Sequence, residues 1–115
     1  MDLGLEGAAV VVSGGSKGMG RASAEAFARD GARVAVLARG TDAIDDTIAE
    51  LERLGAGDAL ALQADLTSGD DVRRAFAAVA ERWGELNVLV NAAGPVDVGV
   101  GPFEAVDDEE WLATF

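Results

Sequence analysis

The 115-residue chain contains no cysteine, no histidine and no tyrosine, and its nine basic residues include a single lysine, Lys17. The absence of cysteine excludes disulfides and thiolate chemistry, and the absence of histidine excludes imidazole ligands for a metal. No acid or base step in these residues can use His, Cys or Tyr. The 21 acidic residues give a net charge of -12, the opposite of the basic surface that electrostatic nucleic-acid binding requires. We therefore expect no metal site and no nucleic-acid partner.

Long apolar runs are missing as well. No run in the sequence approaches the length that crosses a bilayer, and the N-terminus has neither the basic start nor the long apolar core of a signal peptide. We expect no membrane association, with a reducing, cytoplasmic location as the default. Half of the residues are hydrophobic, which predicts one folded domain over residues 1–115.

Short apolar runs alternate along the chain with longer stretches of helical periodicity. The runs are apolar on both faces, which is typical of parallel strands that helices cover on both sides. The expected strands are 8–12, 34–38, 59–62 and 88–90.

Each stretch between the expected strands has apolar residues at helical spacing, which we expect to face the sheet. The three expected faces are Ala22, Ala26 and Phe27; Ile44, Ile48 and Leu51; and Val72, Phe76, Val79 and Trp83. Glycines at 31, 55 and 84 lie where left-handed helix ends need them. Thr41 is the expected N-cap of the second helix, and residues 67–70 supply the cap of the third.

This alternation predicts right-handed crossovers and an α/β fold, a Rossmann-like doubly wound parallel sheet. The expected strand order is 3-2-1-4, and the sheet ends after the fourth strand. In such folds ligands bind beyond the carboxyl ends of the strands, where the strand order reverses. Functional residues are therefore sought at 13–20 and 91–95.

A glycine-rich turn, Ser-Gly-Gly-Ser-Lys-Gly-Met-Gly, follows the first expected strand over residues 13–20. Glycines at 14, 18 and 20 permit a tight turn, and the amides of the next helix then point at an anion. The spacing of Gly15 and Gly20 nearly matches a P-loop, but Arg21 and Ala22 follow where Lys and Ser or Thr are required, which disfavours NTP hydrolysis. A glycine turn by itself can also be a simple chain reversal.

Three segments together resemble the short-chain dehydrogenase/reductase (SDR) family. Residues 13–20 are similar to its T-G-x-x-x-G-x-G turn, with Ser13 in place of Thr. Asp65-Leu66 after the third strand resembles its adenine-contacting acid, and residues 91–94, Asn-Ala-Ala-Gly, resemble its N-N-A-G element, with Ala92 in place of the second Asn. The resemblance covers nearly the whole chain and implies the N-terminal half of an SDR-type fold.

The resemblance implies a nicotinamide cofactor and roles for specific residues. The glycine turn would line the pyrophosphate, Asp65 would accept from the adenine amino group, and the segment after the fourth strand would support the ribose. Asp65 is alternatively a helix-start carboxylate, and both roles can coexist. The expected cofactor-binding residues are Gly14, Ser16, Lys17, Gly18, Met19, Gly20, Arg39, Asp65, Leu66, Asn91, Ala92, Ala93 and Gly94.

The end of the second expected strand indicates which nicotinamide cofactor is bound. NAD sites usually place an acid there for the ribose 2′-hydroxyl, whereas this chain has Arg39. A guanidinium can form charge-assisted hydrogen bonds with a 2′-phosphate, and Lys17 lies in the turn close to the same group. We expect NADP(H) rather than NAD(H), although a shifted turn would bring Asp42 toward the ribose.

The family's Ser, its Tyr-x-x-x-Lys pair and its helix Asn have no counterpart in this sequence, so we expect no catalytic residue in this chain and no activity from it alone. The resemblance implies an oxidoreductase acting on a carbonyl or alcohol substrate, with this chain as its cofactor-binding half and a homo-oligomer at full length. Residues 107–115 predict the start of a further helix. One alternative is a stand-alone nucleotide-binding module without catalysis. Another, a receiver domain with Asp65 as phosphate acceptor, lacks the acidic pair and late lysine that receivers need.

Overall fold

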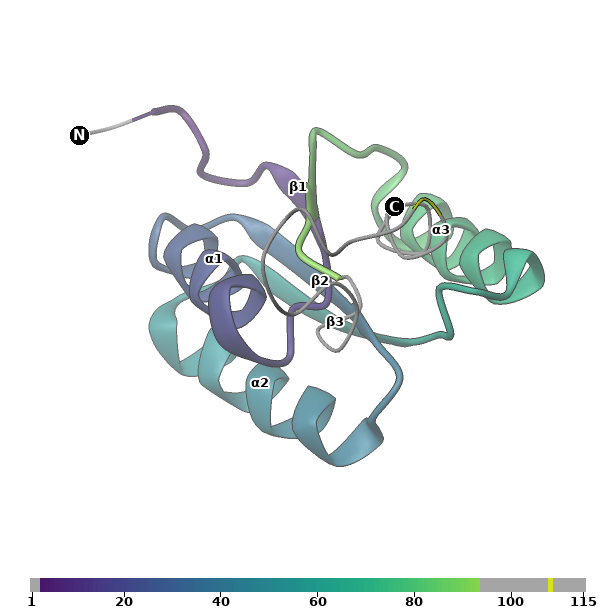
Figure 1. Cartoon of the computed structure of the whole chain (residues 1–115). Helices are drawn as coiled ribbons and strands as arrows, with labels where there is room; N and C mark the ends of the chain where they lie inside the picture. The colour runs from purple at the N-terminus through teal and green to yellow at the C-terminus, as the bar shows by residue number, and fades with distance from the viewer. Residues whose placement is uncertain (1–2, 94–107, 109–115) are drawn as a thin grey trace.

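The computed structural model describes residues 3–93 and 108, and these form a four-stranded parallel sheet with the strand order β3-β2-β1-β4. The expected order is therefore confirmed. Strands and helices alternate along the chain (Figure 1). The elements are β1 (Ala9–Ser13), α1 (Gly18–Arg29), β2 (Arg33–Ala38), α2 (Thr41–Leu54), β3 (Asp58–Gln63), α3 (Gly69–Trp83) and β4 (Val88–Asn91).

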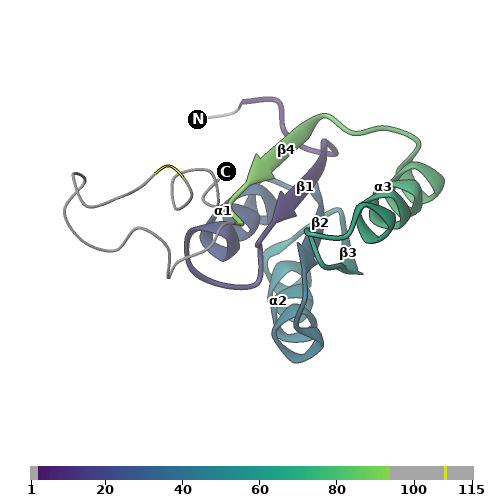
Figure 2. The same ribbon diagram turned by 45° about the vertical axis from the view of Figure 1, so that its right-hand side comes forward.

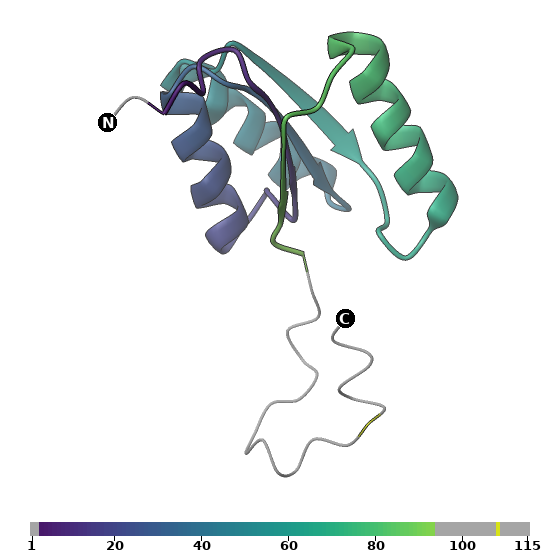
Figure 3. The ribbon, with the colours of Figure 1, turned by 90° about the horizontal axis from the view of Figure 1, so that it is seen from above.

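The helices cover the sheet from both sides. Seen from above, α1 and α2 lie on one side and α3 lies on the other (Figure 3). One core, between the sheet and the first two helices, contains Val10, Val12, Val34, Val36, Ala24, Ala28 and Leu51. The other, beneath α3, contains Val11, Ala35, Leu37, Leu62, Ala75 and Val79. Alternate residues of β1 and β2 enter opposite cores, which explains why both strands are apolar on both faces.

Strand β1 is one of the two inner strands of the sheet and pairs with both β2 and β4. Ser13 at its carboxyl end lies level with Leu37 of β2 and with Asn91 of β4. Figure 2 shows these strands side by side and running in the same direction. The segments that follow β1, β2 and β4 therefore leave the sheet at one edge.

The expected packing face of α1 is wrong. Of its three residues only Phe27 packs against the core. Ala22 and Ala26 are exposed, whereas Ala24 and Ala28 are fully buried. Alanines at every second position give no apolar preference for either face. The close approach of Gly20, four residues before Ala24, turns that side toward the sheet instead.

The helix ends follow the sequence with one exception. Gly55 and Gly84 have positive φ angles of 106° and 71° at the ends of α2 and α3, as expected for left-handed caps. Ser68 caps α3 by accepting a hydrogen bond from Asp71 N at 3.2 Å. Thr41 is not a cap: α2 already includes it, and Gly40 is the N-cap, whose carbonyl accepts the bond from Ile44 N.

The amino end of β3 is tied to the end of α3 by one carboxylate. Asp58 accepts two hydrogen bonds from Arg82, at 2.7 and 2.8 Å, and one from the Trp83 indole at 2.9 Å. These bonds, that of Arg82 above all, lower the pKa of Asp58 from 3.8 to about 2. The Arg33 guanidinium lies 5.6 Å from the centre of the Trp83 ring. The group joins three elements at the edge of the sheet opposite the glycine turn.

Replacing Asp58 with asparagine is expected to lower the free energy of unfolding by about 1 kcal/mol at pH 7, because a paired carboxylate is lost. Since the folded-state pKa is lowered from 3.8 to about 2, the wild-type advantage is present in full above pH 3.8. It is lost as the pH falls through 2. Denaturant unfolding of both proteins across this range measures the difference. Asp70→Asn removes the exposed partner of Arg73 and is the control. A pH-independent difference between wild type and Asp58→Asn would contradict the assignment.

Among the described residues, no helix is both long and apolar enough to cross a membrane.

Candidate functional site

The glycine turn between β1 and α1 is pressed against the segment that follows β4. Gly14 has a φ of +74°, and a Cβ added to it would lie 2.8 Å from the backbone nitrogen of Ala93. The Gly14 amide donates to Leu37 O at 2.8 Å. Two of the expected site segments, far apart in the sequence, are therefore in direct contact, and only a residue without a side chain fits between them.

The other two glycines of the expected motif have different surroundings. A Cβ on Gly20 would lie 2.2 Å from Gly14 O, so α1 starts in contact with the turn itself. Gly18 has a φ of +56° and nothing within 4 Å of its added Cβ. The turn is thus closed at Gly14 and Gly20 and open at Gly18, where a phosphate would find room.

The first turn of α1 presents backbone donors at this open position. The helical ladder starts with the bond from Arg21 N to Lys17 O at 3.2 Å. The amides of residues 18–20 precede it and have no helical acceptor. Met19 is 85% exposed, and its expected contribution to the site is its backbone amide. Lys17 is the N-cap, and its side chain makes no capping bond; Ser16 is partly buried beside it.

The carboxyl end of β4 is bonded to the carboxyl end of β1. The buried Ser13 hydroxyl lies 3.3 Å from Asn91 Oδ1, to which it donates, and Ala92 N donates to Ser13 O at 3.0 Å. Asn91, Ala92 and Ala93 are exposed. Gly94, the expected helix 107–115 and residues 95–102 lie outside the described residues, apart from Asp108.

Asp65 follows β3 and forms a tight turn with Thr67. Its Oδ1 accepts from Thr67 N at 2.9 Å and from Thr67 Oγ1 at 2.6 Å. These bonds, with a contribution from the charge of Arg39, hold the pKa of Asp65 below its usual range. The carboxylate is ionised at neutral pH and accepts but does not donate. Oδ2 has no hydrogen-bond donor in the described part of the chain, so the turn leaves one carboxylate oxygen unbonded. Leu66 beside it is 40% exposed.

The basic residues differ sharply in their partners. All nine lie within residues 17–82. Seven arginines form ion pairs with aspartate or glutamate: Arg21, Arg29, Arg33, Arg53, Arg73, Arg74 and Arg82. Lys17 and Arg39 are exposed and form no ion pair with any residue that the structure describes. These two follow β1 and β2, neighbouring strands, at the same edge of the sheet.

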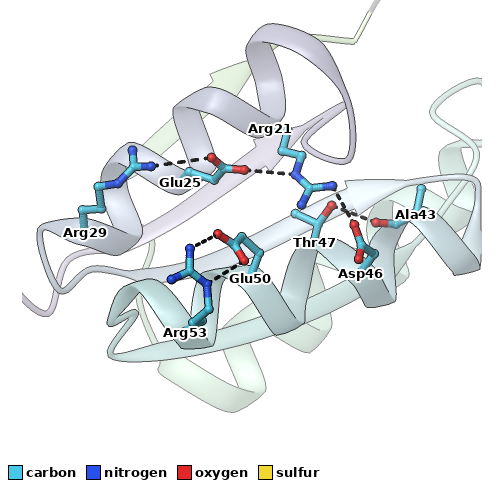
Figure 4. A network of polar contacts seen from close by, with 8 residues as sticks. All are labelled: Arg21, Glu25, Arg29, Ala43, Asp46, Thr47, Glu50 and Arg53. Carbon is cyan, nitrogen blue, oxygen red and sulfur yellow. Dashed lines mark hydrogen bonds and ion pairs between the residues drawn. The ribbon is translucent and has the colours of Figure 1, made fainter.

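Arg21 shows the contrast most clearly because it directly follows the glycine turn. Its guanidinium donates to Glu25 at 3.0 Å and to Asp46 of α2 at 2.8 Å, and Figure 4 shows it lying between these two carboxylates. Neighbouring pairs in the same network join Arg29 to Glu25 and Arg53 to Glu50. The charge of Arg21 serves the contact between α1 and α2.

The sequence did not predict one polar contact at the carboxyl ends of the strands. The side chain of Gln63, the last residue of β3, donates from Nε2 to Arg39 O at 3.1 Å. The only signal in the sequence is a polar residue at the end of an apolar strand. The parallel register, which pairs Ala38 with Gln63, is what brings the two segments together.

Asp42, the acid that a shifted turn would bring toward the ribose, lies in the first turn of α2. Acids at this position stabilise a helix N-terminus.

Comparison with known proteins agrees with this arrangement. The profile of the family described as short chain dehydrogenase matches residues 8–115. An uncharacterized oxidoreductase of Methylorubrum extorquens is 37% identical over 96% of this chain and 44% of its own length. A sorbitol dehydrogenase of Cereibacter sphaeroides is 36% identical over 82% of this chain and 35% of its own.

A solved structure supports the same relation. The L-sorbose reductase of Gluconobacter frateurii, complexed with NADPH and L-sorbose, superposes with a TM-score of 0.82 at 31% identity, over 96% of this chain and 41% of that one. This chain thus spans less than half the length of the relatives that it matches. Fold, glycine turn and sequence agree, and the chain belongs to the short-chain dehydrogenase/reductase family.

Proposed function

We propose that this chain binds NADP(H) at the carboxyl edge of its sheet, for an oxidoreductase that interconverts carbonyl and alcohol groups of small molecules. The observation that carries the proposal is which basic side chains form ion pairs and which do not. Within the described residues, Lys17 and Arg39 are the bases without an ion-pair partner, while seven arginines are paired. In a chain with a net charge of -12, two unpaired bases at one edge of the sheet favour an anionic ligand there.

Described residues suit three parts of the cofactor: the pyrophosphate, the 2′-phosphate and the adenine. The open space at Gly18 and the free amides of α1 suit the pyrophosphate. Arg39 stands where an NAD site has an acid, and its guanidinium suits the 2′-phosphate. The ionised Asp65 suits the adenine amino group. The NADPH complex of the similar L-sorbose reductase adds support for the choice of NADP(H).

The cofactor would supply the hydride, and this chain's residues would bind and orient it. Hydride transfer to a carbonyl also needs a proton donor, and the sequence contains no tyrosine or histidine. We therefore expect these 115 residues to bind the cofactor without turning over a substrate. Substrate class, homo-oligomerisation and cytoplasmic location stay predictions for the whole protein.

A titration with NADPH and NADH, followed by nicotinamide fluorescence, tests the proposal. We expect wild type to prefer NADPH and Lys17→Gln/Arg39→Gln to lose about 10- to 100-fold in NADPH affinity, because charge-assisted hydrogen bonds are removed. NADH affinity should change little. Arg29→Gln/Arg53→Gln removes the same two charges from ion pairs at the ends of α1 and α2 and should leave both affinities unchanged. An undiminished NADPH preference in the double variant would show that the two bases do not hold the phosphate.

A further inference from the structure

The end of β3 holds the backbone from which Arg39 projects. Ala64 N donates to Ala38 O at 2.9 Å, and Gln63 Nε2 donates to Arg39 O at 3.1 Å. Two consecutive carbonyls of the segment that leaves β2 are thus bound from the neighbouring strand. The first bond continues the backbone ladder, and the second depends on one side chain.

Arg39 itself has little else to fix its direction. Its side chain is exposed and unpaired within residues 3–93 and 108. The next residue is Gly40, an extended N-cap with φ -86° and ψ 124° that offers no side-chain cap. The direction in which the guanidinium leaves the chain therefore depends on the orientation of the Arg39 peptide.

The neighbouring acid does not capture Arg39. Asp65 lies close enough for the charge of Arg39 to contribute to its lowered pKa, yet no ion pair joins these two described residues. The Oδ1 atom of Asp65 accepts both hydrogen bonds from Thr67. The Arg39 guanidinium is left available for a ligand, while the backbone of Arg39 is bonded to Gln63.

We propose that Gln63 is a positioning residue for cofactor specificity, which fixes the Arg39 peptide so that its guanidinium meets the 2′-phosphate of NADP(H). The inference rests on the proposed function. Preorganisation of this kind strengthens binding by reducing the entropy lost on contact. It acts through Arg39 alone, so it affects the nucleotide that carries the 2′-phosphate and spares NADH.

A double-mutant cycle on the full chain tests this role. Gln63→Met keeps the length of the side chain and removes the donor. In the wild-type background we expect NADPH affinity to fall about fivefold, the effect of one lost hydrogen bond, and NADH affinity to stay constant. In an Arg39→Gln background the same substitution should change neither affinity, since the group that it positions is gone.

Three other results would overturn the inference. An equal loss of NADPH and NADH affinity would indicate a general structural role, which the free energy of unfolding of Gln63→Met would also register. Unchanged NADPH affinity would show that the bond does not matter for binding. A wild-type protein without NADPH preference would refute the proposed function and the inference together, and the wild-type titration alone reveals this case.

Discussion

Replacement of Gly20 by alanine is expected to lower the free energy of unfolding by about 3 kcal/mol, the upper end of the usual cost of overpacking. The added Cβ would lie 2.2 Å from Gly14 O and 2.8 Å from Gly14 C. Both are backbone atoms of a turn that itself presses on Ala93. No flexible side chain is available to move aside, so α1 must shift away from the sheet.

Gly69→Ala is the matched control for this experiment. Gly69, like Gly20, lies in the first turn of a helix, but the atoms nearest to its added Cβ would be those of the flexible Arg73 guanidinium, at 3.4 Å. We expect its unfolding free energy to stay the same or rise slightly, since alanine restricts the unfolded chain more than glycine does. Urea unfolding of the three proteins gives the comparison. A similar small change in both variants would show that the helix start tolerates a side chain at residue 20.

The glycine variant should also bind nicotinamide nucleotides more weakly than its loss of stability explains. A displaced α1 carries the amides of residues 18–20 with it, and these are the donors proposed for the pyrophosphate. Affinity for NADPH and NADH should fall together, because both contain the pyrophosphate. Titration under conditions where the variant remains folded separates this effect from unfolding.

Arg39→Asp is expected to reverse the cofactor preference. A carboxylate at this position repels the 2′-phosphate and can accept a hydrogen bond from the 2′-hydroxyl of NADH. NADPH affinity should fall about 100-fold or more, because an attractive charge becomes a repulsive one. NADH affinity should hold or improve. The ratio of the NADPH and NADH dissociation constants, measured for wild type and for the variant, shows whether the preference is reversed.

Two further variants assign the cause of that reversal. Arg39→Gln removes the attraction without adding repulsion. Its preference for NADPH over NADH should be intermediate between that of wild type and that of Arg39→Asp. Arg53→Asp makes the same charge change at the far end of α2 and should leave the preference intact. If Arg39→Asp still prefers NADPH, the guanidinium does not meet the phosphate and the proposed cofactor assignment fails.

Local sequence patterns predict much of the architecture. Strands apolar on both faces, glycines at helix ends and short connections predict a doubly wound parallel sheet, because parallel crossovers are right-handed and leave few topologies. The expected order 3-2-1-4 is one of these, and the structure has it. The packing face of α1 is different. Alternating alanines encode no preference, and a contact between Gly20 and Gly14 decides it.

The sequence by itself determined where the glycine turn and Asp65 stand and that no cysteine, histidine or tyrosine is available for chemistry, since these are matters of composition and order along the chain. Only the tertiary structure decided which bases are free. Arg82 pairs with Asp58 across 24 residues, and Arg33 with Glu85 across 52. Such partners meet only when β2, β3, α3 and the segment before β4 are packed together. The same packing binds Gln63 to the Arg39 carbonyl and leaves the guanidinium of Arg39 unpaired in the described part of the chain.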